Sequence, residues 1–534
     1  MKKWTKILAI VLSLGILLSM AGCGSRAAGS AGLRLRNPDA DAIPKEESGA
    51  PTTPGGSWMT MLYGTEPVTL QTDMKLEADY SAVDPALLAM LAEAMGMDFQ
   101  WLQSLGLSAV SGREDDRNRT NFVLKLNDTD ILQGDMLLDL AGMNMYLGLP
   151  ALNPSYIGLD LSEAMSQGVS PYQLRQLVSS IDPELVKDIV LRYFGLLGDS
   201  IEKVAVNKGS VSAGGIRTGC TVARVTFGGE ELLAIARSFL TTAATDSQVE
   251  DLVYQFMSVS GQYRGSTGYF HSSYAQWIED ALAELDETSP EDISESFVLT
   301  FYIDDAGKVL GTSLEVREDG EINALTSFVT ARDGERIGVD ATFGSYDSYN
   351  YSDRRRETRN EVTLSGSGTY TEEGKLTGSF QMGYYLYEDW NGDIDELDIP
   401  LFTLDVDGAR QGLRFVGDVV ITPTRQLLDL AEEEMDGAPR EAIDFVRSLT
   451  LVLSNRSSDT ELDGTAVLCT SGKPFLTLTM TASETESIDM TRPTDVAEPE
   501  EWASSMGVAS LAEVILRLRT AGMPIELLNA MLDY

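Results

Sequence analysis

The sequence predicts an α+β protein built on large, curved antiparallel sheet with helices packed on one face, and it leaves open whether the chain forms two related halves. Two observations carry this prediction. Apolar residues recur at every second position over short segments that end in polar turns, which is typical of antiparallel strands. Segments with helical spacing come in blocks between these groups of strands, whereas a parallel sheet needs strands and helices to alternate one by one.

The first group of strands extends from Thr120 to Leu161, where apolar and polar positions alternate. Asn127-Asp128, Ala141-Gly142 and Asn153-Pro154 interrupt this alternation and predict tight turns. A helix is expected before the group, because Asp84-Pro85 combines a capping side chain with a proline suited to the first helical position.

A second, longer group of strands begins at Phe297 and continues to Thr422, with turns predicted at Asp304–Gly307 and Arg332–Gly334. Three shorter strands are expected further on, at Leu449–Leu453, Gly464–Cys469 and Phe475–Thr481. Spacing of three and four residues between apolar positions predicts helices at Pro171–Val204, Glu230–Thr242, Asp246–Met257, Ser273–Leu285, Arg425–Met435, Arg440–Leu449, Val508–Thr520 and Pro524–Leu532.

Composition and pattern divide the chain into four parts. Residues 1–22 have the features of an export signal, and residues 23–57 are rich in Gly, Ser, Ala and Pro without apolar periodicity, which predicts a disordered tether. Residues 58–290 are expected to form an N-terminal α+β domain. Residues 291–534 are expected to form a C-terminal domain rich in antiparallel strands, with terminal helices.

The signal consists of a lysine-rich start, an apolar run at Ile7–Leu18 that is too short to span a bilayer, and small residues before Cys23. Met20-Ala21-Gly22-Cys23 resembles the lipobox of bacterial lipoproteins, although Met20 stands where that family usually has Leu. The resemblance implies cleavage before Cys23, lipid on its thiol, and a chain anchored to the extracytoplasmic face of a membrane. An ordinary export signal followed by a cysteine is the alternative.

The charge of the chain is strongly negative, because 82 acidic residues face 40 Lys and Arg, for a net charge of −42. Nucleic-acid binding needs a cationic surface, so we expect no nucleic-acid partner. Anionic lipid headgroups repel such a domain as well, and contact with the membrane is expected through the lipid anchor alone. The acidity itself favours solubility over any particular ligand.

The stretch from Phe297 to Val316, a strand–turn–strand unit around Asp304–Gly307, resembles the units of LolA/LppX-like carriers and of uncharacterised Firmicutes-type lipoproteins. In those families a curved antiparallel sheet wraps helices and can leave an apolar cavity. The resemblance implies a fold and an apolar ligand, and it assigns no individual functional residue.

Catalytic motifs are weak throughout the sequence, and no enzyme activity and no cofactor are expected. His271 is the only histidine, and a surface or capping role is favoured over that of a catalytic base. Ser200-Ile-Glu-Lys203 fits a Ser-x-x-Lys pattern, but its companion motifs are not evident. Cys220 and Cys469 are expected to be free thiols, with a disulfide left open.

Asp389, Asn391, Asp393 and Asp395 alternate in a way that calcium-binding loops require, and they are the metal-site candidates. Ile394 replaces the glycine of such loops and Leu401 the final glutamate, so an acidic hairpin turn is the alternative. The basic stretch from Arg354 to Arg359 suggests either a charged strand edge or a docking site for an anionic wall polymer.

These observations favour a non-enzymatic lipoprotein anchored outside the cytoplasm, which binds an apolar or cell-envelope ligand or serves as a structural partner in the envelope. A carboxylate-dependent envelope hydrolase is the first alternative, although the sequence does not nominate a catalytic pair. A transporter-associated solute-binding protein is the second, and the absence of alternating βαβ units disfavours it.

Overall fold

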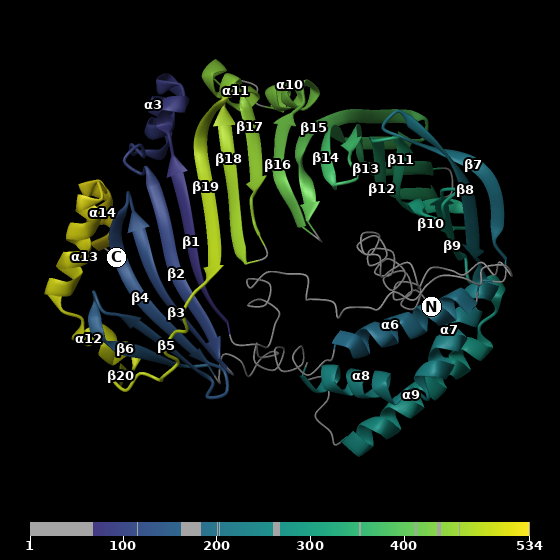
Figure 1. Ribbon diagram of the computed structural model, residues 1–534, viewed down its shortest axis with the longest axis horizontal. Coiled ribbons are helices and arrows are strands. Elements are labelled where there is room, and N and C mark those ends of the chain that lie inside the picture. Colours follow the sequence, from purple (N-terminus) through teal and green to yellow (C-terminus); the bar gives the residue numbers. More distant parts are fainter. Residues whose placement is uncertain are drawn as a thin grey trace. The chain divides into compact units, whose positions relative to one another are not determined.

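The computed structural model describes residues 68–114, 116–161, 183–199, 201, 203–259, 267–351, 354–411, 414–434, 439–458 and 460–532 (Figure 1). The signal peptide, Cys23 and the tether lie outside these residues. Of the helices within the described ranges, none combines the length and the hydropathy that crossing a membrane requires. The α+β prediction is confirmed, because the strands pair almost entirely antiparallel and the helices occur in blocks between them.

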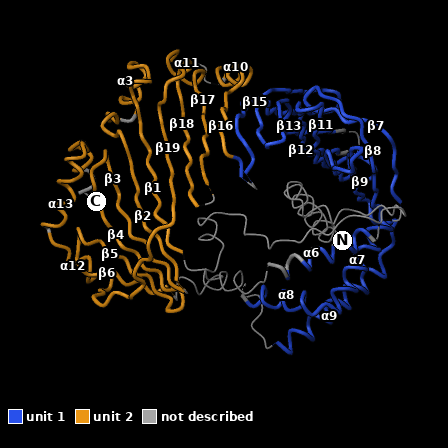
Figure 2. The backbone as a smooth tube through the Cα atoms, viewed as in Figure 1, with its two compact units in different colours: residues 1–52, 181–258, 262–415 blue, residues 53–180, 259–261, 416–534 orange. Residues whose placement is uncertain are grey.

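The chain divides into two compact units, and neither of them is one of the expected domains (Figure 2). Within the described residues, unit 1 comprises those from 183 to 258 and from 267 to 415, and unit 2 comprises those from 68 to 161 and from 416 to 532. The expected boundary at residue 290 falls inside unit 1, between a helix and the strand that follows it. Unit 2 is assembled from both ends of the chain, an arrangement that no local pattern indicates.

Unit 1 contains a meander in which each strand pairs with the next along the sequence. Its strands are β7 (Ala205–Ala213), β8 (Ile216–Phe227), β9 (Glu295–Ile303), β10 (Val309–Glu318), β11 (Glu321–Asp333), β12 (Arg336–Tyr351), β13 (Arg354–Tyr370), β14 (Lys375–Trp390) and β15 (Asp393–Gln411). Its helices are α6 (Pro183–Asp199), α7 (Gly229–Ala243), α8 (Ser247–Val259), α9 (Thr267–Glu287) and the short η3 (Pro290–Asp292). The predicted helix at Pro171–Val204 corresponds to α6 in its described part.

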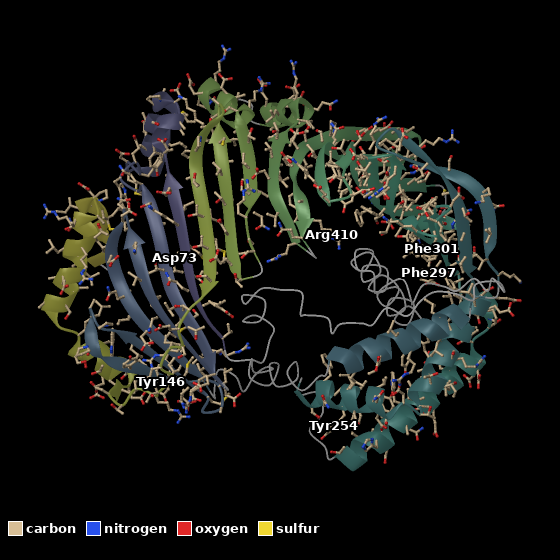
Figure 3. The ribbon with its side chains drawn as sticks, in the orientation of Figure 1. Asp73, Tyr146, Tyr254, Phe297, Phe301 and Arg410 are labelled. Carbon is tan, nitrogen blue, oxygen red and sulfur yellow. The ribbon has the colours of Figure 1, made fainter. Side chains whose placement is uncertain are left out.

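Helix α7 covers one face of the sheet of unit 1 at β8, β9 and β10. Leu232 and Ile235 of α7 belong to a buried cluster with Phe297 of β9 and Leu314 of β10, and Phe301 packs against it (Figure 3). These apolar residues stand at alternate strand positions, as the sequence pattern predicts. The helix therefore lies on the face that the alternation marks as apolar.

The sheet of unit 1 curls so that the tip of the β7–β8 hairpin packs against β11, β12 and β13. Thr218 fixes the contact, because its hydroxyl donates to the carbonyl of Arg332 (2.8 Å) and accepts from the amide of the same residue (2.6 Å). The amide of Gly214 donates to Asp340 (3.2 Å), and buried Cys220 lies in the apolar cluster under the hairpin.

Unit 2 contains one sheet in which β19 from the C-terminal part pairs antiparallel with β1 from the N-terminal part. The sheet runs in the order β16-β17-β18-β19-β1-β2-β3-β4-β5-β6, and β20 adds to β6 in the parallel sense. Its strands are β1 (Val68–Ala78), β2 (Ser104–Glu114), β3 (Arg117–Leu126), β4 (Thr129–Asp139), β5 (Asn144–Leu149), β6 (Asn153–Asp160), β16 (Arg414–Pro423), β17 (Leu449–Asn455), β18 (Glu461–Thr470), β19 (Lys473–Glu484) and β20 (Val496–Ala497).

The helices of unit 2 pack at the ends and margins of its sheet. They are η2 (Tyr80–Ala82), α3 (Pro85–Met95), α10 (Arg425–Glu434), α11 (Arg440–Arg447), α12 (Pro499–Ser505), α13 (Val508–Thr520) and α14 (Ile525–Leu532). Helix α3 begins as predicted, because Asp84 accepts from the amide of Ala86 (2.8 Å) and Pro85 takes the first helical position. It ends at Gly96, whose φ of 70° suits a residue without a Cβ.

Candidate functional site

The acidic candidates for a metal site lie in the hairpin between β14 and β15. Asn391 and Gly392 form its two-residue turn with φ angles of 56° and 90°, and Asp389 accepts from the amide of Gly392 (2.7 Å). Asp389 lies opposite Ile394, so it is on the other face of the hairpin from Asp393 and Asp395. The hairpin therefore does not bring the carboxylates together, and no group of three potential ligands poised for a metal occurs among the described residues.

The basic stretch lies on β13, and the expectation that it marks a strand edge was wrong. β13 is an inner strand that pairs with both β12 and β14 along its length. Arg356 lies 3.5 Å from Glu388 and over the ring of Trp390, while Arg359 pairs with Glu357. Arg356 and Arg359 are thus paired with neighbouring carboxylates on the same sheet, which is a poor arrangement for holding an anionic polymer.

The other sequence candidates occupy separate places in the chain. His271 lies within α9 rather than before it, and its Nδ1 is 2.5 Å from Glu250 on α8. Cys220 and Cys469 are both free thiols in the structure. Ser200 lies outside the described residues. Among the described candidates, His271, Cys220 and Cys469 lie on different elements and do not form a common site.

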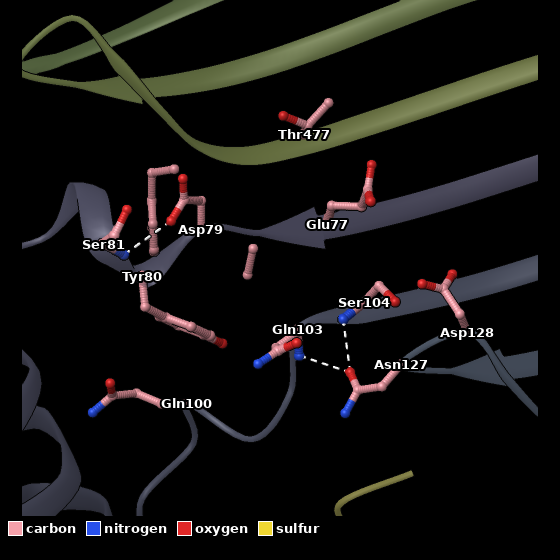
Figure 4. Close-up of a pocket in the computed structure, with 12 residues that line it drawn as sticks. Glu77, Asp79, Tyr80, Ser81, Gln100, Gln103, Ser104, Asn127, Asp128 and Thr477 are labelled. Atoms are coloured by element: carbon pink, nitrogen blue, oxygen red, sulfur yellow. Dashed lines mark hydrogen bonds between the residues drawn. The ribbon is translucent and has the colours of Figure 1, made fainter.

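A polar pocket of about 630 Å³ lies at one end of the sheet of unit 2, next to the β3–β4 turn (Figure 4). Asn127 is central to it, but its side chain already accepts from the amides of Gln103 and Ser104 and donates to the carbonyls of Trp101 and Ala521. A primary amide can do little more, because it carries two donor hydrogens and one acceptor oxygen. We therefore interpret the Asn127 cluster as a structural junction between the β3–β4 turn and the C-terminal helices.

The acids that line the same pocket are also engaged within the chain. Hydrogen bonds from the Ser81 hydroxyl and from the Ser81 amide (3.0 Å) lower the pKa of the Asp79 carboxyl. Lys75 lies 2.9 Å from both Glu77 and Asp128, and these hydrogen bonds raise the pKa of the lysine. These contacts leave the pocket without a group poised for chemistry.

The most distinctive surface of unit 2 is one face of its sheet, on which every residue of a long cross-strand row is apolar. The row is formed by Val419, Leu453, Ala466, Leu478, Leu76, Leu105 and Leu126, on β16, β17, β18, β19, β1, β2 and β3 in that spatial order. We call it the leucine row. Leu76, Leu105, Leu453 and Leu478 are each between 37 and 45% exposed. A single exposed leucine is common on protein surfaces, whereas a row of neighbouring exposed apolar residues is typical of a surface that binds an apolar ligand or partner.

A second apolar row runs beside the leucine row on the same face. It comprises Gly464, Met480, Met74, Leu107, Leu124 and Leu132, again in direct register across neighbouring strands. Leu124 is 40% exposed. The two methionines lie side by side on β1 and β19, and their flexible thioether chains adapt well to apolar ligands of irregular shape.

The opposite face of the same strands is polar. One position along each strand from the two apolar rows, the side chains point to the opposite face and form a polar row. This row contains Thr465, Thr479, Lys75, Gly106 and Lys125. Lys125 lies 3.8 Å from Asp130. Near the other end of this polar face, Arg119 pairs with Asp135 and donates to the carbonyl of Asp489 (2.7 Å), which ties the segment after β19 across the sheet. The sheet of unit 2 is therefore amphipathic, with polar side chains on one face and apolar side chains on the other.

Unit 1 has an apolar sheet face of its own. One row on it consists of Phe328, Ala341, Leu364, Met382 and Phe402, on β11 to β15. In the adjoining row Phe343 is 50% exposed. This face continues the one that α7 covers further along the sheet, and it adds a second apolar surface to the molecule.

The alternation in the sequence predicted the strands that contain Leu453 and Leu478. It did not predict the leucine row, because the row depends on the pairing of β1 with β19. No family model and no curated protein matches the sequence. The apolar face of unit 2 is accordingly assigned from its geometry alone.

Proposed function

We propose that this protein is a non-enzymatic lipoprotein of the extracytoplasmic membrane face that binds an apolar ligand on the apolar face of unit 2. The single observation that supports the proposal most is the leucine row, with four half-exposed leucines in register across neighbouring strands. Covering the remaining exposed part of each leucine would contribute about 1 kcal/mol, given roughly 1.5–3 kcal/mol for burying a whole side chain. Four such contacts would together contribute about 4 kcal/mol, from which the cost of immobilising the ligand is subtracted.

The position of Cys23 supports the anchoring part of the proposal, since the lipobox resemblance implies lipid on this residue. The apolar face supports the ligand class, because an acyl chain needs continuous apolar contact and few hydrogen-bonding partners. The two rows provide such a surface along several strands, and their methionines and leucines carry no fixed polar group. We therefore expect selectivity for chain length and shape rather than for a particular headgroup.

The test compares two lysine substitutions on adjacent strands of unit 2. Leu105→Lys places a charge in the leucine row, whereas Asn121→Lys places the same charge on the polar face of β3, at a site that is also exposed. We expect Leu105→Lys to weaken binding of a fluorescent long-chain fatty acid by about tenfold or more, equivalent to about 1.4 kcal/mol. The Asn121→Lys protein should bind as the unmodified chain does.

A second measurement is the lipid content of the full-length protein purified from membranes. Organic extraction and native mass spectrometry should detect noncovalent lipid on the unmodified chain and on Asn121→Lys, but less on Leu105→Lys. Equal fatty-acid binding by both variants, or lipid-free protein that does not bind the fatty acid, would contradict the proposed ligand class. Thermal unfolding of each variant checks that the lysine has not unfolded unit 2.

A further inference from the structure

Strands β12 to β15 extend beyond their neighbour β11 and form a four-stranded arm. The pairing of β11 with β12 ends at Ser345, whereas β12 continues to pair with β13 as far as Tyr351 opposite Arg354. β14 and β15 extend equally far, to Trp390 opposite Asp393. We define the arm as residues 346–351, 354–359, 387–390 and 393–396. Among the side chains that the structure describes, none of the arm belongs to the buried apolar clusters of unit 1, although Thr358 is buried.

One face of the arm carries two tyrosines and an arginine side by side. Tyr346 on β12, Arg359 on β13 and Tyr387 on β14 occupy a single cross-strand row, and Glu396 on β15 completes it. We call Tyr346, Arg359 and Tyr387 the tyrosine platform. Both rings are partly exposed. Adjacent strands are about 4.8 Å apart, so the backbone positions of the two tyrosines are roughly 10 Å apart across the sheet.

The ring of Tyr346 lies flat on the sheet. A Cβ built at Gly344 would be 2.6 Å from the Tyr346 hydroxyl oxygen and 2.8 Å from its Cζ, so the ring occupies the space above this glycine. The hydroxyl donates to Glu361 (2.8 Å), which fixes the ring in that position. A flat ring held from below and at its tip offers its outer face to a ligand.

The centre and far end of the tyrosine platform are fixed as well. The guanidinium of Arg359 lies 5.3 Å from the centroid of the Tyr387 ring, and its Nε donates to Glu357 (2.9 Å). One step along the sheet, the hydroxyl of Tyr385 donates to Glu396 (3.2 Å). The planar groups are therefore preorganised, and carboxylates surround them at the level of the sheet.

From this arrangement we propose that the tyrosine platform binds an extended, uncharged β-linked polysaccharide. The apolar face of a sugar ring stacks on an aromatic ring, and carboxylates accept hydrogen bonds from sugar hydroxyls. The spacing of roughly 10 Å between strands β12 and β14 is close to the repeat of two sugar rings in an extended β-linked chain. This site is on a different unit from the leucine row and does not depend on the proposed function.

The charges around the platform favour a neutral ligand over an anionic one. Glu357, Glu361 and Glu396 lie around the guanidinium of Arg359, and the whole chain carries a net charge of −42. An anionic polymer would meet repulsion at short and long range, whereas hydroxyl groups would find acceptors.

The experiment titrates the full-length protein with chitotetraose, cellotetraose and maltotetraose in a calorimeter. We expect measurable binding of at least one of the two β-linked tetrasaccharides, and weaker binding of α-linked maltotetraose. Tyr346→Ala and Tyr387→Ala should each reduce the affinity about tenfold, equivalent to about 1.4 kcal/mol. Tyr346→Phe keeps the ring above Gly344 and should retain most of the affinity.

Trp390→Ala is the matched control, because Trp390 is an exposed aromatic residue of the same arm that points to the opposite face. This variant should bind as the unmodified protein does. Absence of binding to all three sugars, an equal loss in Trp390→Ala, or tighter binding of polygalacturonate would overturn the proposal. Cross-linking of the platform to a protein without any sugar binding would overturn it in favour of a protein partner.

Discussion

Tyr193 on α6 has a buried hydroxyl group with no hydrogen-bond partner among the described residues. Its ring packs edge-on against Phe239 of α7, with 5.4 Å between the centroids. Burial, together with the negative charge of Asp246, raises the pKa of Tyr193 to about 12. The ring thus stabilises the contact between two helices, while its hydroxyl is an uncompensated polar group in the interior.

Replacing Tyr193 by Phe should increase the free energy of unfolding by about 1 kcal/mol at neutral pH, since a buried hydroxyl without a partner is destabilising. The difference should grow with alkalinity. In the unfolded chain the Tyr193 phenol ionises near pH 10, whereas in the folded state its pKa is raised to about 12. The free energy of unfolding is therefore unaffected below pH 10 and falls as the pH rises from there towards 12. The Tyr193→Phe variant has no phenol to ionise and avoids that loss, so denaturant unfolding at neutral pH and near pH 11 measures both effects.

Tyr274 is the control for this substitution, because it lies in the same helical layer and its hydroxyl donates to the carbonyl of Ala243 (3.2 Å). Tyr274→Phe should reduce the free energy of unfolding at neutral pH, since it leaves that carbonyl without its donor. An equal loss of stability in both variants would mean that the Tyr193 hydroxyl is hydrogen-bonded in solution.

Among the elements, the β7–β8 hairpin approaches the backbone of β12 closely at Gly338. A Cβ added at Gly338 would lie 1.8 Å from the carbonyl oxygen of Ala213, and the main chain cannot move aside as a flexible side chain can. Gly338→Ala should therefore reduce the free energy of unfolding by about 2 kcal/mol, within the range for overpacking. The amide of Gly214 at the hairpin tip, which donates a hydrogen bond to Asp340, should also exchange its hydrogen faster in this variant.

Gly219→Ala provides the comparison on β8, because nothing lies within 4 Å of a Cβ built there. It should leave stability unchanged or slightly higher, since Ala has less backbone freedom to lose than Gly. Equal effects of the two substitutions would show that the contact at Gly338 is relaxed in solution.

At this scale the sequence predicted the elements well, because their signals are local. Asp84-Pro85 starts α3, and Asp304–Gly307 turns between β9 and β10 as expected. The β7–β8 contact could not be predicted, since it depends on how strongly the sheet curls and not on any pattern within the hairpin. The tyrosine platform was missed for a related reason. Tyr346, Arg359 and Tyr387 come from three strands, and only their register places them in one row.

For the whole molecule, the proposed anchor at Cys23 makes a direct prediction. Cys23→Ser removes the thiol that would carry the lipid, and the protein should then be released from membranes or accumulate with its signal uncleaved. Fractionation of cells into membrane and soluble material, together with the mass of the protein, measures both outcomes. Unchanged membrane attachment of the serine variant would exclude Cys23 as the anchor.

Local sequence patterns gave the least information about how the chain divides into units. Sequence patterns suggested two consecutive domains, but β1 pairs with β19, and unit 1 is inserted between the two parts of unit 2. Strand pairing over such a distance has no periodicity of its own, and every antiparallel strand offers the same hydrogen-bonding groups. The leucine row shares this dependence, as Leu76 and Leu478 face each other only through that pairing.

The pairing of β1 with β19 also fixes an order of assembly. β1 becomes available for pairing among the first strands and β19 among the last, whereas the strands of unit 1 pair with their sequence neighbours and can assemble before β19 arrives. Until residue 484 has been made, one edge of β1 remains open and the leucine row is incomplete. A prematurely terminated chain would therefore expose an unpaired strand edge, which can aggregate, and would lack the complete leucine row. Only the complete chain can then form the proposed binding surface.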